Sequence, residues 1–244
     1  MRCTVGCSCK CMTDFNPIRI FEASLVSPGA PQIFALSIAS SLRASGDSCN
    51  RLTIESSGRL RSSPGAKRSA QFAASRWLLG YAARNVYGAD AVLRVTENPG
   101  RGPILTVESP SASPTTSLSH SDSTVICGIA RSGALGVDVE RVRARSDWEG
   151  IAAYALHPRE RSRINRLPDA QRWDHFFKIW TLKEAMGKAL GVGLALPFNQ
   201  IEVSSDGEIA DAPRDCGLRA EGWRLAVLNL GVGLAGAAAW RADR

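Results

Sequence analysis

The chain is poor in the residues that most often bind structural zinc. It has three histidines in 244 residues, and none of its seven cysteines belongs to a C-x2-C pair. Four cysteines lie within residues 3–11 at spacings unlike those of a zinc loop, and residues 1–15 are expected to form a disordered tail. The pattern therefore argues against a zinc finger or a histidine-rich zinc site.

The chain also lacks a long apolar run. Its most apolar segment, residues 225–240, contains an asparagine and three glycines and is shorter than the ~20 residues that a membrane-spanning helix needs. Two buried strands meeting near Gly231 are expected there instead. The first twelve residues lack the apolar segment of a signal peptide, and the odd, dispersed cysteines suit a reducing compartment. We therefore expect a cytoplasmic protein that does not enter a membrane.

The composition is that of a globular protein with a basic surface. Hydrophobic residues make up 44% of the chain and charged residues 22%, and the net charge is +7. This charge favours an anionic partner without choosing its class. The basic residues are scattered, and no zinc-finger, helix-turn-helix or aromatic–basic pattern is present. A nucleic-acid-binding protein is thus the weaker alternative, and no nucleic-acid partner is expected.

One expected helix carries an acid on its apolar face. Four aromatic residues recur at i, i+3, i+4 and i+7: Trp173, Phe176, Phe177 and Trp180. This spacing predicts the buried face of an amphipathic helix over residues 173–190. Glu184 continues the stripe, and Lys188 follows one turn later. In isolation the two are typical of a surface pair, but a carboxylate on a buried stripe needs a cation, a metal ion or donors from elsewhere.

A second acidic pattern lies on an expected strand. In G-V-D-V-E, Asp138 and Glu140 point to the same side of the strand while the two valines face the core. Like charges on one face repel, but they become favourable when they share a hard cation such as Mg²⁺. Solvated strand faces also show this pattern, so Asp138 and Glu140 alone do not decide between the two readings.

The remaining elements predict a mixed α+β protein in two lobes, residues 16–123 and 124–244. Residues 68–86 are helical in character, and Arg68 and Arg76 flank Phe72 on one face. Residues 124–130 and 135–142, joined by R-S-G-A, predict a β-hairpin. A chain that holds both lobes is expected to act as a monomer.

Three motifs then occur in a specific order. They are S-L-S-H-S at 117–121, G-V-D-V-E at 136–140 and W-T-L-K-E-A-M-G-K at 180–188, followed by G-V-G-L-A-L-P-F at 191–198. In order and spacing they resemble the surfactin-synthetase-activating type of the 4′-phosphopantetheinyl transferase superfamily. The resemblance covers residues 116–203 and, more weakly, residues 68–88. It implies a pseudo-twofold arrangement of two similar α/β lobes with the active site at their interface.

The resemblance also implies a reaction. It is the Mg²⁺-dependent transfer of 4′-phosphopantetheine from coenzyme A to a serine of an apo acyl or peptidyl carrier protein, with release of adenosine 3′,5′-bisphosphate. Asp138, Glu140 and Glu184 would bind Mg²⁺, Glu184 would also serve as the base, and Lys188 would offset charge on the diphosphate. Five residues are implied to contact coenzyme A: Arg68, Arg76, Arg101, Ser119 and His120.

The chain departs from the family in one loop. The family commonly has G-K-P before the S-H-S segment, whereas this chain has G-R-G-P, so Arg101 is the candidate replacement for that lysine. Glu160 in H-P-R-E matches a family glutamate near the carrier-binding region, although an exposed helix acid explains it equally well. A homologue that has lost catalysis and only binds a carrier protein is the remaining alternative.

Overall fold

The computed structural model describes residues 18–22, 30–38, 52–55, 65–98, 102–204, 207–218 and 222–243. It divides into two compact units, Met1–Ser132 and Gly133–Arg244. Arg101 and the expected tail, residues 1–15, lie outside the described residues. No helix in the described ranges is both long enough and apolar enough to cross a bilayer.

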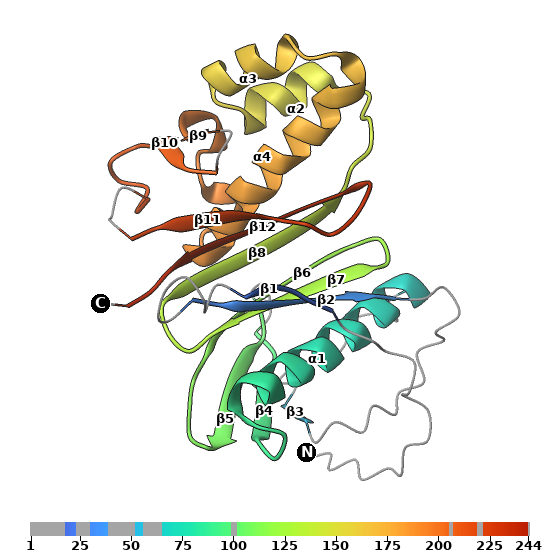
Figure 1. Ribbon diagram of the computed structural model, residues 1–244, viewed down its shortest axis with the longest axis vertical. Helices are drawn as coiled ribbons and strands as arrows, with labels where there is room; N and C mark the ends of the chain where they lie inside the picture. Colours follow the sequence, from blue (N-terminus) through green and yellow to red (C-terminus); the bar gives the residue numbers. More distant parts are fainter. Residues whose placement is uncertain are drawn as a thin grey trace. The chain divides into compact units, whose positions relative to one another are not determined.

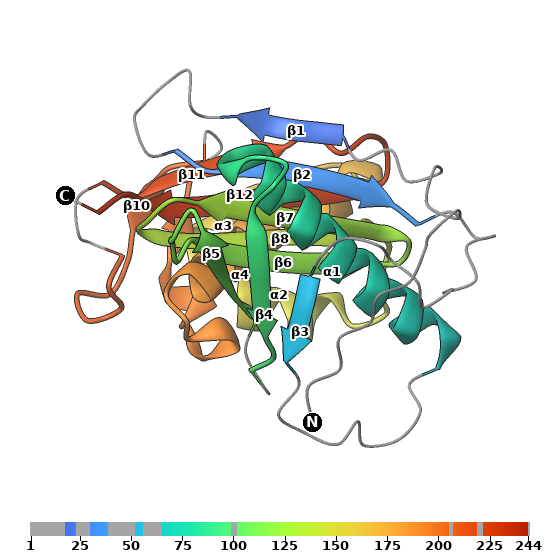
Figure 2. The ribbon, with the colours of Figure 1, turned by 90° about the horizontal axis from the view of Figure 1, so that it is seen from below.

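The first unit contains one long helix and two small sheets. Its elements are β1 (Ile18–Glu22), β2 (Gln32–Ser37), β3 (Leu52–Glu55), α1 (Ala66–Tyr87), β4 (Val92–Thr96), β5 (Ile104–Ser109), β6 (Thr115–Ser121) and β7 (Thr124–Ala130). One sheet has the order β1-β2-β7-β6 and the other β3-β4-β5. Helix α1 packs against β7, β2 and β6 (Figure 2), and its Leu78 and Leu79 are fully buried with strand residues of both sheets.

The second unit places a helix on a three-stranded sheet. Its strands and helices are β8 (Ala134–Arg141), α2 (Trp148–Ala155), α3 (Pro158–Asn165), α4 (Asp169–Ala189), the 3₁₀ helices η2 (Gly193–Ala195) and η3 (Phe198–Gln200), β9 (Glu202–Val203), β10 (Ile209–Asp211), β11 (Arg224–Leu228) and β12 (Leu234–Arg241). Strands β11, β12 and β8 form the sheet in that order. Helix α4 packs on β8 and β12, and α2 and α3 lie beside the N-terminal half of α4 (Figure 1).

The expected hairpin between residues 124–130 and 135–142 does not form. Strand β7 pairs with β6 and β2, whereas β8 pairs with β12 along its whole length. The hairpin that does form joins β6 to β7 through Asp122 and Ser123, and Asp122 adopts a positive φ of 49°, which aspartate tolerates better than most residues. Strand β7 thus belongs to the first unit, and the chain divides at R-S-G-A. The expected pair of strands around Gly231 is confirmed as β11 and β12. Only β12 is buried as expected, because all residues of β11 except Leu228 are exposed or half-buried.

Gly136 lets α4 lie unusually close to β8. A Cβ atom at this position would collide with the carbonyl oxygen of Ala185 and would lie 2.6 Å from the backbone nitrogen of Ala189. Neither backbone atom can move without displacing the helix. The first residue of G-V-D-V-E is therefore needed to bring the last turns of α4 against the strand that carries Asp138.

A fully buried ion pair fixes the other side of α4. The Lys183 ammonium donates to Glu160 Oε2 at 2.5 Å and to the carbonyl oxygens of Ala155 and Phe198 at 2.9 and 2.8 Å. Both side chains have no exposed surface. The three donors of the ammonium are all used, which is the condition under which a buried charge is tolerated.

The Glu160 carboxylate is satisfied equally completely. Its Oε2 also accepts from the backbone N–H of His157, and its Oε1 accepts from the N–H of Val203, at 2.8 and 2.7 Å. Together with the His157 side chain, Glu160 forms a capping box at the start of α3. Glu160 is thus not the exposed helix acid that the sequence allowed.

Removing one partner of this pair should strongly destabilise the second unit. Lys183→Met leaves the Glu160 carboxylate buried without its counter-charge, so we expect a loss of about 3–5 kcal/mol in the free energy of unfolding. The double variant Lys183→Met/Glu160→Leu should lose less free energy of unfolding than the single variant, because no uncompensated charge remains buried. Urea denaturation followed by tryptophan fluorescence measures both.

The matched control for this measurement is Lys178→Met, which replaces an exposed lysine of the same helix. A change of about 0.5 kcal/mol or less is expected for this surface substitution. Equal losses for Lys178→Met and Lys183→Met would contradict a special role for the buried pair.

Candidate active site

Strand β8 places the two acids of the D-x-E motif at the C-terminal half of the strand. Val137 and Val139 are buried as expected, but residues 135–139 are all buried, so burial does not alternate along the strand; Glu140 is half-buried. Asp138 lies opposite Ala237 of β12 and is itself buried. A buried carboxylate requires a partner, and α4 supplies it.

The aromatic stripe of α4 is confirmed. Phe176 and Phe177 are buried, Trp173 and Trp180 are half-buried, and Trp180 packs edge-on against Phe198 with the ring centroids 5.7 Å apart. These contacts fix the rotation of the helix about its axis. They turn Glu184 and Lys188 toward β8, which packs along the same helix.

Lys188 is the partner of Asp138. Its Nζ donates to Asp138 Oδ1 at 2.7 Å and to the carbonyl oxygen of Val137 at 3.1 Å. The side chain of Lys188 remains about one-third exposed, whereas that of Asp138 is buried. The motif lysine on the helix and the first motif acid on the strand, 50 residues apart in sequence, thus form an ion pair.

Glu184 lies among these charges. Burial raises its pKa from 4.5 to about 7; the carboxylates of Asp138 and Glu140 contribute to the rise, and Lys188 opposes it. The carboxylates of Asp138 and Glu140 thus both lie within electrostatic reach of Glu184. A carboxyl group with a pKa close to neutrality is suited to accept a proton at physiological pH.

By their ligand type, the three carboxylates suit a hard divalent cation. Mg²⁺ prefers carboxylate oxygens and needs only a few of them when phosphate oxygens and water complete its shell. A dication would also relieve the repulsion that raises the pKa of Glu184. In the part of the chain that the structure describes, no three Asp, Glu, His or Cys side chains are already gathered as ligands of one ion; Asp138 Oδ1 is engaged by Lys188 instead. Magnesium ligation therefore stays a prediction.

Arg76, predicted to contact coenzyme A, lies on α1 of the first unit. Its guanidinium binds the Glu97 carboxylate through two hydrogen bonds of 2.6 Å, from Nε to Oε1 and from Nη2 to Oε2. It also covers the Phe72 ring at 4.4 Å, as the helical spacing indicated. Arg68 is exposed two turns earlier on the helix. Any phosphate bound by Arg76 would have to share the guanidinium with Glu97.

Ser119 and His120 are successive residues of β6. Their side chains therefore point to opposite faces of the strand, and the structure has Ser119 buried and His120 exposed. A bound phosphate that met both side chains would have to lie at the strand edge or end. Their assignment to coenzyme A, like that of Arg68 and Arg76, remains a prediction.

Two features of α4 explain parts of the motif that the sequence left unexplained. Lys183 lies at i+7 from Phe176, so the helical spacing already placed it on the buried stripe, a signal that the neighbouring Glu184 obscured. Gly187 is buried where η2 folds back on the helix: a Cβ atom there would lie 2.5 Å from the carbonyl oxygen of Gly193. Glycine is thus required for this close approach.

Comparison with known proteins finds a family match in this region. Residues 134–236 match the 4′-phosphopantetheinyl transferase superfamily. The matched range contains Asp138, Glu140, Glu184 and Lys188, so the resemblance expected from the motifs is confirmed over it. The finer assignment to the surfactin-synthetase-activating type stays a prediction.

Several curated relatives are enzymes of this class. The chain is 39% identical over 87 residues to the 4′-phosphopantetheinyl transferase HetI of Nostoc sp., covering 36% of each chain. It is 30% identical over 120 residues to a 4′-phosphopantetheinyl transferase of Bacillus subtilis, covering 45% of this chain and 52% of the relative. The similarity to the transferase gsp of Aneurinibacillus migulanus is 32% over 89 residues, 36% of each chain. The chain thus matches about half the length, or less, of these relatives.

The raised pKa of Glu184 predicts a pH-dependent effect on stability. Burial disfavours the ionised form of Glu184 in the folded chain. The pKa of its carboxyl group is about 4.5 in the unfolded chain and about 7 in the folded chain, so the free energy of unfolding falls as the pH rises between these two values. The Glu184→Gln variant does not lose this stability, because the glutamine side chain does not ionise. Without divalent ions, the free energy of unfolding of the variant should rise relative to that of the wild type between pH 5 and pH 8. The expected rise is roughly 1–2 kcal/mol after allowance for solvent screening.

Thermal unfolding across this pH range measures the gain. Glu208→Gln is the control, because it makes the same substitution at an exposed acid of the same unit, and its difference from wild type should stay within about 0.5 kcal/mol at every pH. A constant difference for Glu184→Gln as well would mean that Glu184 ionises like an ordinary surface glutamate.

Proposed function

We propose that the protein transfers 4′-phosphopantetheine from coenzyme A to a serine of an apo acyl or peptidyl carrier protein, in a Mg²⁺-dependent reaction that releases adenosine 3′,5′-bisphosphate. The observation that carries the proposal is the convergence of Glu184 and Lys188 of α4 on Asp138 of β8. These are motif residues within the range that matches the superfamily.

The residues divide the work of phosphoryl transfer in the proposed reaction. The serine Oγ attacks the phosphorus next to the pantetheine arm, forming a P–O bond, while the bond from that phosphorus to the oxygen of the leaving adenosine 3′,5′-bisphosphate breaks. Glu184 takes the serine proton, the role for which a carboxylate beside the attacking hydroxyl is suited. Lys188 stabilises the negative charge that develops on the leaving phosphate.

Asp138 and Glu140 would hold Mg²⁺ together with Glu184. When bound, Mg²⁺ supplies positive charge to the diphosphate and orients it for in-line attack. Asp138 is buried and fixed by the sheet, which suits a rigid ligand, and Glu140 lies two residues further along the same strand. The Lys188 ammonium, which donates to Asp138 Oδ1, would then be available to phosphate oxygens.

Removal of either acid should abolish transfer. Asp138→Asn and Glu184→Gln are expected to lower the rate at least about 100-fold, because one removes a metal ligand and the other removes the base as well. The measurement is the mass of an apo carrier protein after incubation with coenzyme A and Mg²⁺. Chelation of Mg²⁺ by EDTA should stop the wild-type reaction.

Glu149→Gln serves as the control for these variants and should retain wild-type activity. Retained transfer by Glu184→Gln would contradict the proposed base. A wild-type protein that binds carrier proteins but releases no adenosine 3′,5′-bisphosphate would instead identify a homologue without catalysis.

A further inference from the structure

Lys188 contacts strand β8 at two atoms. Its Nζ donates to Asp138 Oδ1 at 2.7 Å and to the carbonyl oxygen of Val137 at 3.1 Å. The Asp138 side chain is buried, which strengthens its attraction to a cation, whereas the Lys188 side chain is about one-third exposed. The ion pair is therefore strong enough to matter for other ligands of Asp138, and water and solutes can still reach the ammonium.

The ammonium competes with any metal ion at the same carboxylate. Two single positive charges about 4 Å apart repel each other by about 4 kcal/mol at an effective dielectric constant of about 20, and a dication doubles this energy. An ammonium 2.7 Å from Asp138 Oδ1 therefore opposes a Mg²⁺ ion on Asp138. Metal binding at Asp138 would require the Lys188 ammonium to move away from this oxygen.

The arrangement of the acids agrees with such a competition. Among the residues that the structure describes, no three acidic, histidine or cysteine side chains are gathered around one point as ligands of a metal ion. Glu140 lies two residues beyond Asp138 on β8, and Glu184 lies one turn before Lys188 on α4. The lysine thus lies between the strand and the helix that would have to share the metal ion.

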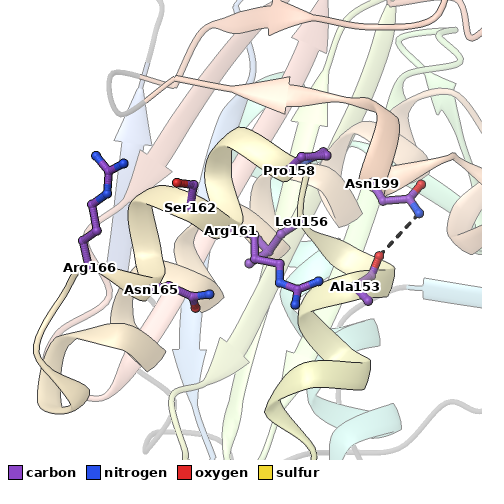
Figure 3. Close-up of a pocket in the computed structure, with 8 residues that line it drawn as sticks. All are labelled: Ala153, Leu156, Pro158, Arg161, Ser162, Asn165, Arg166 and Asn199. Carbon is purple, nitrogen blue, oxygen red and sulfur yellow. Dashed lines mark hydrogen bonds between the residues drawn. The ribbon is translucent and has the colours of Figure 1, made fainter.

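The arginines nearest in the fold to the start of α4 do not take part in this contact. Arg161 and Arg166 line a groove of about 660 Å³ between α2 and α3, and no residue of β8 or α4 lines it (Figure 3). Arg161 also binds the Glu149 carboxylate at 2.7 Å. The cation that bonds to Asp138 is Lys188, so the exchange at Asp138 depends on this one side chain.

A diphosphate has the chemistry to remove Lys188 from Asp138. Phosphate oxygens are strong acceptors, and a lysine ammonium is a compact charge on a flexible stem that can turn toward them. Because Lys188 is partly exposed, a diphosphate can approach it from solvent. Asp138 would then lose its counter-charge while buried, which is costly, and a metal ion could restore it.

We propose that Lys188 keeps divalent metal off Asp138 until the diphosphate of coenzyme A binds, so that metal and coenzyme A bind cooperatively through the exchange of this one ion pair. The inference rests on the proposed function, since it takes the diphosphate to be that of coenzyme A. The coupling is reciprocal: the diphosphate raises the affinity for the metal ion by the same factor as the metal ion raises the affinity for coenzyme A.

Metal affinity without coenzyme A is the first test. Lys188→Met removes the ammonium, and electron paramagnetic resonance of free Mn²⁺ measures binding without turnover. We expect Lys188→Met to bind Mn²⁺ about tenfold more tightly than the wild type, equivalent to about 1.4 kcal/mol. Lys188→Arg, which keeps the charge, and Lys178→Met, at an exposed position of the same helix, should stay within about twofold of the wild type.

The cooperativity itself is the second test. Calorimetry without a carrier protein gives the factor by which Mg²⁺ lowers the Kd for coenzyme A, and this factor should be about tenfold larger in the wild type than in Lys188→Met. Binding of Mg²⁺ to coenzyme A in solution is the same for all variants. A lysine that only repelled the metal ion through space would leave the factor unchanged when removed, because its effect would not depend on coenzyme A.

Lys188→Gln is the second variant, because its amide can still donate to Asp138 and so protects the fold. The same two results are expected for it. An Mn²⁺ affinity like that of the wild type in both uncharged variants, or an unchanged factor, overturns the exchange, even if the wild type is an active transferase. A wild type that shows the expected cooperativity but modifies no apo carrier protein overturns the proposed transfer alone, and one that does not bind coenzyme A overturns both.

Discussion

The buried Lys183–Glu160 ion pair is the constraint on which the arrangement of the second unit depends. Through its hydrogen bonds it joins the end of α2, the start of α3, the middle of α4, η3 and β9. Charges without any exposed surface are stable only if every donor and acceptor is paired. These segments must therefore all be in place together, which makes the position of α4 specific along its axis and in rotation.

The position of the proposed catalytic residues follows from that of α4. Glu184 is the next residue after Lys183 and is turned about 100° from it around the helix, so the pair that buries Lys183 directs Glu184 elsewhere. Gly136 then sets how closely the helix meets β8. With rotation and distance both fixed, Lys188 reaches Asp138 at 2.7 Å. The stable interior of the unit and its reactive surface are thus two faces of one helix.

Much of this could be predicted from the sequence because periodic patterns report burial directly. The aromatic stripe predicted α4, and the alternation of valine and acid predicted β8. The motifs grouped Asp138 with Glu184, but they placed Lys188 on the diphosphate, so the Lys188–Asp138 ion pair was not predicted. Strand pairing could not be read in the same way: the R-S-G-A turn suited a hairpin, yet β8 pairs with β12, almost 100 residues away in sequence. Glu160 was equally ambiguous, since only the fold reveals that Lys183 lies opposite it.

The two ion pairs of α4 differ in a way that matches their roles. Lys183 is enclosed by three acceptors and has no exposed surface, so exchange of its partner would leave a charge buried and unpaired. Lys188 is partly exposed, and the carboxylate it binds lies beside an acid whose pKa is raised to about 7. If another cation took the place of Lys188 at Asp138, the free-energy cost would be far lower than for Lys183, because water reaches the released ammonium. On the proposed function, the first pair would hold the helix still while the second exchanged partners as coenzyme A and magnesium bound.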